Sequence, residues 1–413
     1  MPKIYLIDVT NRDGVQTARL GLSKLEKTMI NIYLNEMGVF QSEFGFPTTR
    51  HEVNYLQANL ELAEMGELQP IRLGGWIRAI VEDVETTFQR VPNIKHLNLS
   101  MSTSNQMLNG KFKGKKSKED IIKDMVEAVR TARSHGAESV GVNAEDASRT
   151  DLDYLIQFGK AGRDNGADRF RYCDTLGYDT PFTIYETGKI LAEQIGMPIE
   201  LHCHNDLGMA VANSMAGAGG VIDGGQDAYI NTTINGIGER AGNADLIAVI
   251  LAATKSKRFS EKYELGGKID LSKAWQISKF ASYAFDVPIP INQPGVGVNV
   301  FAHESGIHAD GVLKDPENYE LYGYEELGRG ETEFVETGRE ISTGEYSGIS
   351  GFSHVMGQLE VSFGDDREWA NEILELVRYA NVESQKPLVE AELLFIARYP
   401  EIAKKLLTLT PLE

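Results

Sequence analysis

Short runs of apolar and β-branched residues alternate with longer amphipathic segments along the N-terminal part of the chain. The longer segments follow a helical period, as in residues 118–135, where charged side chains occupy one face and apolar side chains the other. The short runs predict eight strands, at residues 4–10, 39–46, 71–76, 96–103, 139–145, 169–175, 198–205 and 228–234. Eight strand–helix units within about 250 residues predict an α/β fold of the (β/α)8 TIM-barrel type. A doubly wound sheet is the alternative, but it usually contains fewer strands.

Polar and chemically active residues gather at the carboxyl ends of most of these runs. They are Arg12, Asp13, Glu43, Thr103, Ser104, Glu145, Asp146, Asp174, Thr175, His202, His204 and the segment 235–243. In a barrel these ends converge on one face, where active sites of this fold lie. The pattern therefore predicts an active site at the barrel mouth.

The part of the chain that follows the barrel pattern predicts two smaller units. Residues 287–300, rich in Pro and Gly, indicate an ordered linker, and residues 303–327 indicate a compact segment. Residues 331–356, rich in Gly, Ser, Thr and Glu, predict a mobile lid or an extended connection. Residues 369–412 predict two helices with a break near 385–387. We expect a catalytic domain at 1–275, a linker and subdomain at 276–330 and a C-terminal lid and helical extension at 331–413.

The segment His202-Cys203-His204 is the sharpest local signal for metal binding. Residues i and i+2 of a strand point to the same side, so both imidazoles are expected to face the barrel mouth. Asp13 follows the first strand, which lies beside the last strand when a barrel closes. Two imidazoles and a carboxylate suit a divalent metal such as Mn, Mg, Co or Zn, with positions left for a substrate. The alternative is a pair of core histidines with satisfied hydrogen bonds.

The net charge of −19 argues against a nucleic-acid partner or an acidic membrane surface, because such surfaces attract Lys and Arg. The two cysteines, Cys173 and Cys203, give no disulfide framework and fit the reducing cytoplasm. The N-terminus has no signal-peptide pattern, and no apolar run approaches the length of a membrane span. The segment 231–243 has two glycines at dinucleotide-motif spacing, but it follows the eighth strand, where a close-approach loop is the better interpretation. We therefore expect a cytoplasmic protein.

Several longer motifs resemble the DRE-TIM metallolyase family that contains the 2-isopropylmalate, homocitrate, citramalate and Re-type citrate synthases. The motifs are DVTNRDGVQ at 8–16, EFGFP at 43–47, EDA at 145–147, DTLGY at 174–178, HCHNDLGMAVAN at 202–213, NGIGERAGN at 235–243 and HESGIHADG at 303–311. They occur in the family's order and cover residues 4–325. The resemblance implies a metal-dependent Claisen condensation of an acyl-CoA with a 2-oxo acid, catalysed by an acyltransferase with acetyl-CoA as co-substrate.

The resemblance also implies roles for individual residues. The implied metal ligands are Asp13, His202, His204 and Asn243. The implied catalytic residues are Arg12, which would stabilise the developing alkoxide or enolate, the carboxylate Glu145, and the base His308 with Glu304 and Tyr319. The expected substrate contacts are Gln16, Glu43, Thr103, Thr175 and Arg149. In this family the segment around His308 reaches into a neighbouring subunit, which implies a homodimer. A plain salt bridge from Arg12 to Glu43 and a packing role for Tyr319 are the structural alternatives.

The choice of 2-oxo acid depends on departures from the family pattern. Isopropylmalate synthases place a His at the position of Asn98, and homocitrate synthases use Arg side chains where this chain has Gly141 and Leu108. The sequence of the first 50 or so residues is most similar to the Re-face citrate synthases, which implies that oxaloacetate is the 2-oxo acid. Arg78, Arg149 and Arg171 are candidates for its distal carboxylate. The alternatives are a homocitrate synthase acting on 2-oxoglutarate, then a citramalate or isopropylmalate synthase, a metal-dependent aldolase or lyase on the same barrel, and a non-catalytic homologue.

Overall fold

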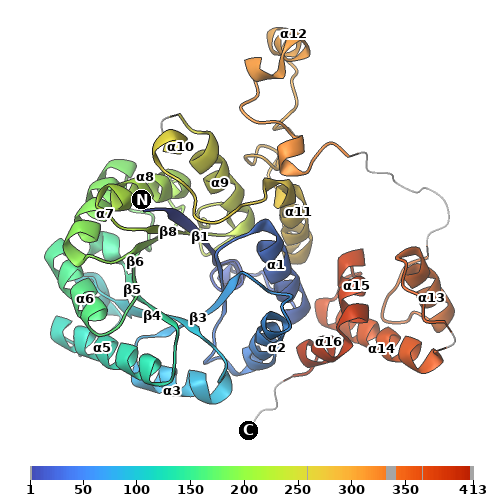
Figure 1. Cartoon of the computed structure of the whole chain (residues 1–413), viewed down its shortest axis with the longest axis horizontal. Helices are drawn as coiled ribbons and strands as arrows, with labels where there is room; N and C mark the ends of the chain where they lie inside the picture. The colour runs from blue at the N-terminus through green and yellow to red at the C-terminus, as the bar shows by residue number, and fades with distance from the viewer. Residues whose placement is uncertain (1, 258, 332–340, 365, 410–413) are drawn as a thin grey trace.

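The computed structural model describes residues 2–257, 259–331, 341–364 and 366–409. Eight parallel strands form a closed barrel in sequence order, which confirms the predicted TIM barrel (Figure 1). They are β1 (Ile4–Asp8), β2 (Gln41–Gly45), β3 (Arg72–Arg78), β4 (His96–Ser102), β5 (Ser139–Glu145), β6 (Arg169–Asp174), β7 (Ile199–Cys203) and β8 (Ala228–Thr232). The ends of these strands differ from the predicted runs by no more than two residues.

Helices surround the strands as an outer ring (Figure 1). They are α1 (Lys24–Met37), α2 (Val53–Glu64), α3 (Val81–Arg90), α5 (Lys118–Ser134), α6 (Leu152–Asp164), α7 (Pro181–Ile195), α8 (Ala210–Asp223) and α9 (Leu246–Lys255), with the shorter α4 (Asn105–Gly110) and α10 (Phe259–Lys262). The predicted helix at 118–135 is α5. It begins at Lys118 because the hydroxyl of Ser117 accepts a hydrogen bond from the Asp120 amide, which satisfies one of the free N–H groups of the first turn.

The inner face of the barrel changes from aromatic to polar along its axis. Near the amino ends of the strands the ring of Tyr5 lies 5.0 Å from those of Phe40 and Tyr229, centroid to centroid. The guanidinium of Arg169, two strands away from Tyr229, lies over that ring at 4.9 Å, so these side chains meet inside the barrel. Above this aromatic layer the inward-facing side chains are charged or polar, and they lead to the mouth.

Closure of the barrel places the first strand beside the last. Asp8 of β1 is in register with Thr232 of β8, and the amide of Val9 donates to the carbonyl of Thr232. The turn after β1 therefore lies next to the ends of β7 and β8. This neighbourhood connects residues that are far apart in the sequence, as the metal-site prediction requires.

After the barrel the chain forms α11 (Ala274–Phe285), which packs on α1, and then the segment with α12 (Gly306–Lys314), which projects away from the barrel (Figure 1). The expected domain boundary near residue 275 falls in the first turn of α11, and the three-domain division stays a prediction. None of the residues of α12 is buried in the single chain. This segment is the one expected to carry the catalytic base.

The C-terminal part differs from expectation in two respects. Part of the segment 331–356 was expected to be a lid or an extended connection, but α13 (Ile349–Gln358) is a helix with Phe352 and Met356 fully buried; residues 332–340 lie outside the described part. Residues 369–412 were expected to form two helices, whereas three are present: α14 (Arg367–Ser384), α15 (Glu390–Arg398) and α16 (Pro400–Leu406). Pro400 explains the extra break, because proline has no N–H to continue α15.

The predicted break near 385–387 is confirmed, and the C-terminal helices lie beside α1 and α2 (Figure 1). Gln385 has a positive φ of 58°, which ends α14. Lys386 then pairs with Glu26 of α1 at 2.9 Å, and Lys24 donates to the carbonyl of Thr408 at 3.1 Å. Within the described ranges we find no helix that combines the length and the apolar character needed to cross a bilayer.

Candidate active site at the barrel mouth

A cavity of about 190 Å³ lies at the carboxyl ends of the strands. Its lining comes from the turn after β1, from β3 to β7 and the turns that follow them, and from the loop after β8. The lining residues are Arg12, Asp13, Gln16, Trp76, Ser100, Glu145, Arg171, Cys173, Thr175, His202, His204, Glu239 and Arg240. Several residues expected at an active site from the sequence are therefore brought to one cavity.

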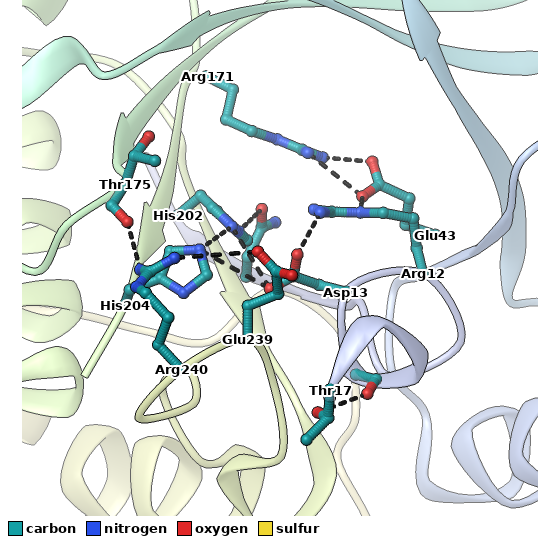
Figure 2. A network of polar contacts seen from close by, with 12 residues as sticks. Arg12, Asp13, Thr17, Glu43, Arg171, Thr175, His202, His204, Glu239 and Arg240 are labelled. Carbon is teal, nitrogen blue, oxygen red and sulfur yellow. Dashed lines mark hydrogen bonds and ion pairs between the residues drawn. The ribbon is translucent and has the colours of Figure 1, made fainter. Parts of the chain in front are cut away.

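Asp13, His202 and His204 form a buried cluster at this cavity, with their ligand atoms within 4.8 Å of one another. The Nε2 atoms of both histidines lie 3.8 Å from Oδ2 of Asp13 and 3.2 Å from each other. Figure 2 shows the two imidazoles and the carboxylate converging from the ends of β7 and β1. This spacing fits a single divalent cation held by two nitrogens and one oxygen.

Burial and a neighbouring cation set the protonation of the cluster in the form that a metal site requires. Removal from water lowers the pKa of His202 and of His204, so both imidazoles are neutral. Burial alone would raise the pKa of Asp13, but the adjacent Arg12 guanidinium opposes it, and that pKa lies below its ordinary value. The cluster therefore offers two lone pairs and an ionised carboxylate near neutral pH.

Asn243 lies next to this cluster because the loop after β8 folds back on β7. Its backbone forms a bridge with His204, and its buried Oδ1 finds no hydrogen-bond partner among the residues that the structure describes. A Cβ on Gly238 would lie 1.7 Å from this Oδ1, so the amide can occupy its place only because residue 238 is glycine. An unpartnered buried acceptor beside the cluster fits the expected role of Asn243 as a fourth ligand or near neighbour.

Arg12 is held by two carboxylates at the floor of the cavity. Its Nε donates to Glu43 at 2.6 Å and its Nη1 donates to Asp13 at 2.6 Å. Glu43 also accepts from Nη2 of Arg171 at 2.6 Å, and Figure 2 shows both guanidinium groups directed at this carboxylate. Burial would raise the pKa of Glu43, but Arg171 and Arg12 lower it far below its ordinary value. The arrangement fixes the Arg12 guanidinium at the cavity, and Glu43 orients it through a direct hydrogen bond.

The carboxylate of Glu145 forms the wall of the cavity on the side of β4 and β5. It accepts hydrogen bonds from the hydroxyl of Ser102 and from Nζ of Lys111, the latter at 2.6 Å. Thr103 donates to the carbonyl of Glu145 at 3.1 Å, and Thr175 accepts from the amide of Asp146 at 2.9 Å. These threonines brace the loops that carry Glu145.

Arg149 and the expected base lie apart from the cavity in the single chain. Both Nε and Nη2 of Arg149 donate to Asp146, which keeps the guanidinium on its own loop. His308 and Tyr319 stack on each other with their ring centroids 4.2 Å apart, but they belong to the projecting α12 segment, as does Glu304. One chain by itself therefore does not bring His308 to the metal cluster.

Sequence reasoning missed several residues at the site. Trp76 and Ser100 face the cavity, and their inward direction follows from strand alternation once the register is known. Arg240 donates to Asp206 at 2.9 Å. It also donates to the carbonyl of Thr175 (Figure 2), so it ties the ends of β6, β7 and β8 together. Asn143 lies on the same inward strand face as Glu145, and its side-chain N and O are buried without a hydrogen-bond partner in the described part of the chain.

The fold and this cluster define a TIM-barrel protein with a two-histidine, one-carboxylate centre at its mouth. The HMGL-like family model matches residues 3–281, and the model described as "Homocitrate synthase post-HMGL domain-like" matches residues 296–382. The chain belongs to the HMGL-like family and carries the post-HMGL domain of the homocitrate synthases. Both predicted memberships, the family and its synthase branch, are thereby confirmed.

Curated relatives cover nearly the whole chain. A "Citrate (Re)-synthase" from Dehalococcoides mccartyi (strain CBDB1) is 72% identical over 412 residues, which is 100% of this chain and 99% of that protein. "2-isopropylmalate synthase 2" from Caldanaerobacter subterraneus subsp. tengcongensis is 37% identical and covers 95% of this chain and 94% of its own length. "Homocitrate synthase 1" from Nostoc sp. is 32% identical, with 96% and 98% covered.

Solved structures share the fold at low sequence identity. The HMG-CoA lyase of Bacillus subtilis aligns with a TM-score of 0.56 at 16% identity and covers 70% of this chain and 97% of its own. The carboxyl transferase domain of Rhizobium etli pyruvate carboxylase aligns with a TM-score of 0.52 at 15% identity, covering 96% and 61%. These likenesses support the barrel architecture.

The buried contact between Glu43 and its two arginines leads to a stability prediction. Glu43→Gln removes the negative charge that compensates Arg12 and Arg171, so we expect a loss of about 3–5 kcal/mol in the free energy of unfolding. Glu145→Gln, at a partly exposed carboxylate that pairs with Lys111 and Ser102, is the matched control and is expected to cost less than about 1 kcal/mol. Urea unfolding followed by circular dichroism measures both; equal losses would contradict the assigned role of Glu43.

Proposed function

We propose that the chain is a divalent-metal-dependent acyltransferase that condenses acetyl-CoA with oxaloacetate, and that water then releases citrate and free CoA. The observation that carries the proposal is the cluster of Arg12, Asp13, His202 and His204 in one cavity, in a chain 72% identical over its length to a citrate (Re)-synthase. The overall reaction joins acetyl-CoA, oxaloacetate and water and yields citrate and CoA. Free, buried Cys173 and Cys203 fit a reducing compartment, and the cytoplasm is the location that we propose.

The metal would be held by Asp13, His202 and His204, with Asn243 as a fourth ligand or near neighbour. The fit rests on the short distances between their ligand atoms and on the unpartnered Oδ1 of Asn243 among the described residues. A bound Mn, Mg, Co or Zn ion would polarise the keto carbonyl of a chelating 2-oxo acid. Mixed nitrogen and oxygen ligands do not choose among these metals.

The side chains of the protein supply the charge and the proton transfers. Arg12 presents a guanidinium that Glu43 and Asp13 hold in place, and it stabilises the alkoxide oxygen that forms when the new carbon–carbon bond is made. A base must first remove a proton from the acetyl methyl group, and we assign this role to His308, supported by Tyr319 and Glu304. Water then cleaves the C–S bond, leaving a carboxylate on the product and a thiol on CoA.

His308 reaches the cavity in this proposal because a second copy of the chain supplies it. The α12 segment of the single chain projects from the barrel, and its apolar side chains Ile307 and Leu313 are 76% and 87% exposed (Figure 1). Near the barrel mouth, Phe182 at the start of α7 is 82% exposed. Exposed apolar surface on both parts supports a homodimer in which the segments are exchanged.

A second cavity of about 220 Å³ adjoins the first and shares Trp76, Ser100 and Glu145 with it. Its other lining residues include Arg78, Lys111 and Lys116. Each of these three cations pairs with a carboxylate but keeps at least a third of its side chain exposed, unlike Arg171. Beside an apolar wall they suit the phosphates and the linear arm of a coenzyme A thioester. We place acetyl-CoA along this side, with its acetyl group towards Glu145 and the metal cluster.

Asn143 is our candidate for the distal carboxylate of the acceptor acid. It is fully buried and does not itself line the cavity, but it faces inward on β5 between its register neighbours Ser100 and Arg171, which both do. A fully buried amide whose N–H groups find no acceptor among the described residues is suited to bind an anionic oxygen. The guanidinium of Arg171, by contrast, is 1% exposed and already donates to Glu43 and Glu200.

The reaction class is tested by thiol release from acetyl-CoA, measured with a thiol-reactive dye. We expect oxaloacetate to support release at least about ten times better than 2-oxoglutarate, 2-oxoisovalerate or pyruvate. EDTA should abolish release, because Asp13 and the two histidines then lack the ion, and Mn²⁺ or Mg²⁺ should restore it. A preference for 2-oxoglutarate would favour a homocitrate synthase, and no release by metal-replete protein would favour the aldolase or lyase alternative.

The role of Asn143 is tested by comparing the KM for oxaloacetate with the KM for acetyl-CoA. For Asn143→Ala we expect the KM for oxaloacetate to rise about tenfold or more, because a hydrogen bond to a charged group is worth about 1.5–3 kcal/mol. The KM for acetyl-CoA should stay within about twofold, since the thioester binds elsewhere. Asn143→Asp is the matched variant and should raise the oxaloacetate KM further by charge repulsion. An unchanged KM in both variants would contradict the assignment.

The exchange of segments is tested by mixing inactive variants. Arg12→Ala and His308→Ala are each expected to inactivate the homodimer. In a heterodimer formed by unfolding and refolding the mixture, one barrel keeps Arg12 and receives an intact His308, so about a quarter of the wild-type activity should return. Arg12→Ala mixed with His202→Ala is the control and should stay inactive, because each barrel then carries a lesion. No recovery in the first mixture would contradict the exchange.

A further inference from the structure

A chain of buried hydrogen bonds connects His202 to side chains deeper inside the barrel. His202 of β7 lies beside Asn231 of β8, and Nδ1 of the imidazole lies 3.0 Å from Oδ1 of the amide. The Nδ2 group of Asn231 donates to Oε1 of Glu200 at 2.7 Å. All three side chains lie inside the barrel, and none is more than 5% exposed.

The charge of Glu200 decides the direction of every hydrogen bond in this chain. A carboxylate only accepts, so it takes an N–H group of Asn231 and turns the amide oxygen towards His202. An amide oxygen also only accepts, so Nδ1 of His202 must carry the proton. The lone pair of His202 is thereby left on Nε2, the atom that faces Oδ2 of Asp13 at 3.8 Å.

The second histidine of the cluster has no such support in the structure. Nδ1 of His204 is buried and has no hydrogen-bond partner among the residues that are described. The ring of His204 meets that of His202 edge to face, with centroids 4.9 Å apart. Only the imidazole of His202 is therefore fixed in both orientation and tautomer by side chains deeper in the barrel.

Glu200 is also an anchor for the arginine side of the site. It accepts from Nε of Arg171 at 2.7 Å and from Nε of Arg169 at 3.3 Å. Arg171 in turn binds Glu43, which holds Nε of Arg12 at 2.6 Å. One fully buried carboxylate thus lies at the junction of two arms, one ending at His202 and the other at Arg12.

We propose that Glu200 and Asn231 are positioning residues that lock His202 in the Nδ1–H tautomer, and that Glu200 joins the metal-binding imidazole to Arg12 through Arg171 and Glu43. Neither residue lines the cavity, and their side-chain hydrogen bonds are made to each other, to His202 and to buried arginines, so both act through others. Outer hydrogen-bond partners of this kind typically change metal affinity 10- to 100-fold when they are removed. The inference rests on the proposed metal site, and it does not depend on which 2-oxo acid is the substrate.

The test uses the full chain with ¹⁵N-labelled histidine and has two readouts. The ¹⁵N chemical shifts of the metal-free protein report the tautomer of His202, and electron paramagnetic resonance of free Mn²⁺ gives the dissociation constant for Mn²⁺. In the wild type we expect a single Nδ1–H form for His202. In Asn231→Leu, which keeps the size of the side chain, we expect a mixture of tautomers and a dissociation constant about 10–100 times higher.

Asn98→Leu is the matched control. Asn98 is another buried amide of the barrel interior that donates to a carboxylate, Glu43, at 2.7 Å. The substitution therefore leaves a buried carboxylate short of one donor, as Asn231→Leu does, but it does not touch His202. We expect the tautomer of His202 in this variant to match the wild type, because the hydrogen bond of Asn98 is made to Glu43, whereas Nδ1 of His202 meets Asn231.

A reversed pair provides the rescue. In the double variant Glu200→Gln with Asn231→Asp, the amide of residue 200 can donate to the carboxylate of residue 231, which still accepts from Nδ1 of His202. We expect the Nδ1–H tautomer to return and the Mn²⁺ affinity to recover to within about threefold of the wild type. Recovery of the Mn²⁺ affinity would show that the direction of the hydrogen bonds controls it, and not only the packing of the side chains.

Wild-type tautomer and Mn²⁺ affinity in Asn231→Leu would overturn the inference. Loss of the Nδ1–H tautomer in Asn98→Leu would overturn it too, because the effect would then be general to the barrel interior. Failure of the wild type to bind Mn²⁺ would overturn the proposed metal site instead. In that case the tautomer in the metal-free variants still decides whether Asn231 and Glu200 fix His202.

Discussion

The buried ion network inside the barrel is the constraint on which the site depends. Arg12, Glu43, Arg171 and Glu200 come from the turn after β1, from β2, from β6 and from β7 respectively, and each guanidinium lies between carboxylates. Removing such charges from water costs several kcal/mol per ion unless every one finds its partner. Only a closed barrel in the observed strand register brings these partners together, so fold and site are set by one arrangement.

The cavity carries a different balance of charge from the protein as a whole. The net charge of −19 belongs to the whole chain, whereas the cavity is lined by Arg12, Arg171 and Arg240 in equal number with the carboxylates Asp13, Glu145 and Glu239. Burial keeps the two histidines neutral, and the neighbouring Arg12 keeps Asp13 ionised against the effect of burial, so the local charge is organised for a cation. Electrostatics at the site therefore depends on local order and not on the overall charge.

The proposed catalytic residues belong to two parts of the chain, the packed barrel and the exposed α12 segment. The metal cluster and Arg12 are fixed by the packed barrel, where each side chain has partners deeper in the interior. The proposed base belongs to α12, which has no buried residue in the single chain. Such a segment gains order by packing on another surface, and the exposed apolar side chains around Phe182 offer one. In this scheme assembly completes the active site.

The sequence by itself determined the barrel and the identity of the cluster. Strand period, helix caps and polar residues at strand ends are local properties that the sequence shows directly. In a closed barrel the carboxyl ends of all strands lie on one face, so the polar residues at those ends must gather there. The two histidines of β7 share a side because alternate residues of a strand do so. The synthase motifs around them, including the one that contains His308, could likewise be found without a structure.

Only the tertiary structure decided which side chains act on one another. Glu200 and Asn231 lie on different strands, and their link to His202 depends on the stagger between β7 and β8, which no local pattern encodes. The same holds for Asn143, whose lack of partners is a property of its surroundings. The helix α13 and the break at Pro400 were misjudged because composition suggested a loop and an unbroken helix. Long-range packing settles these questions, since each contact joins residues that the chain order keeps apart.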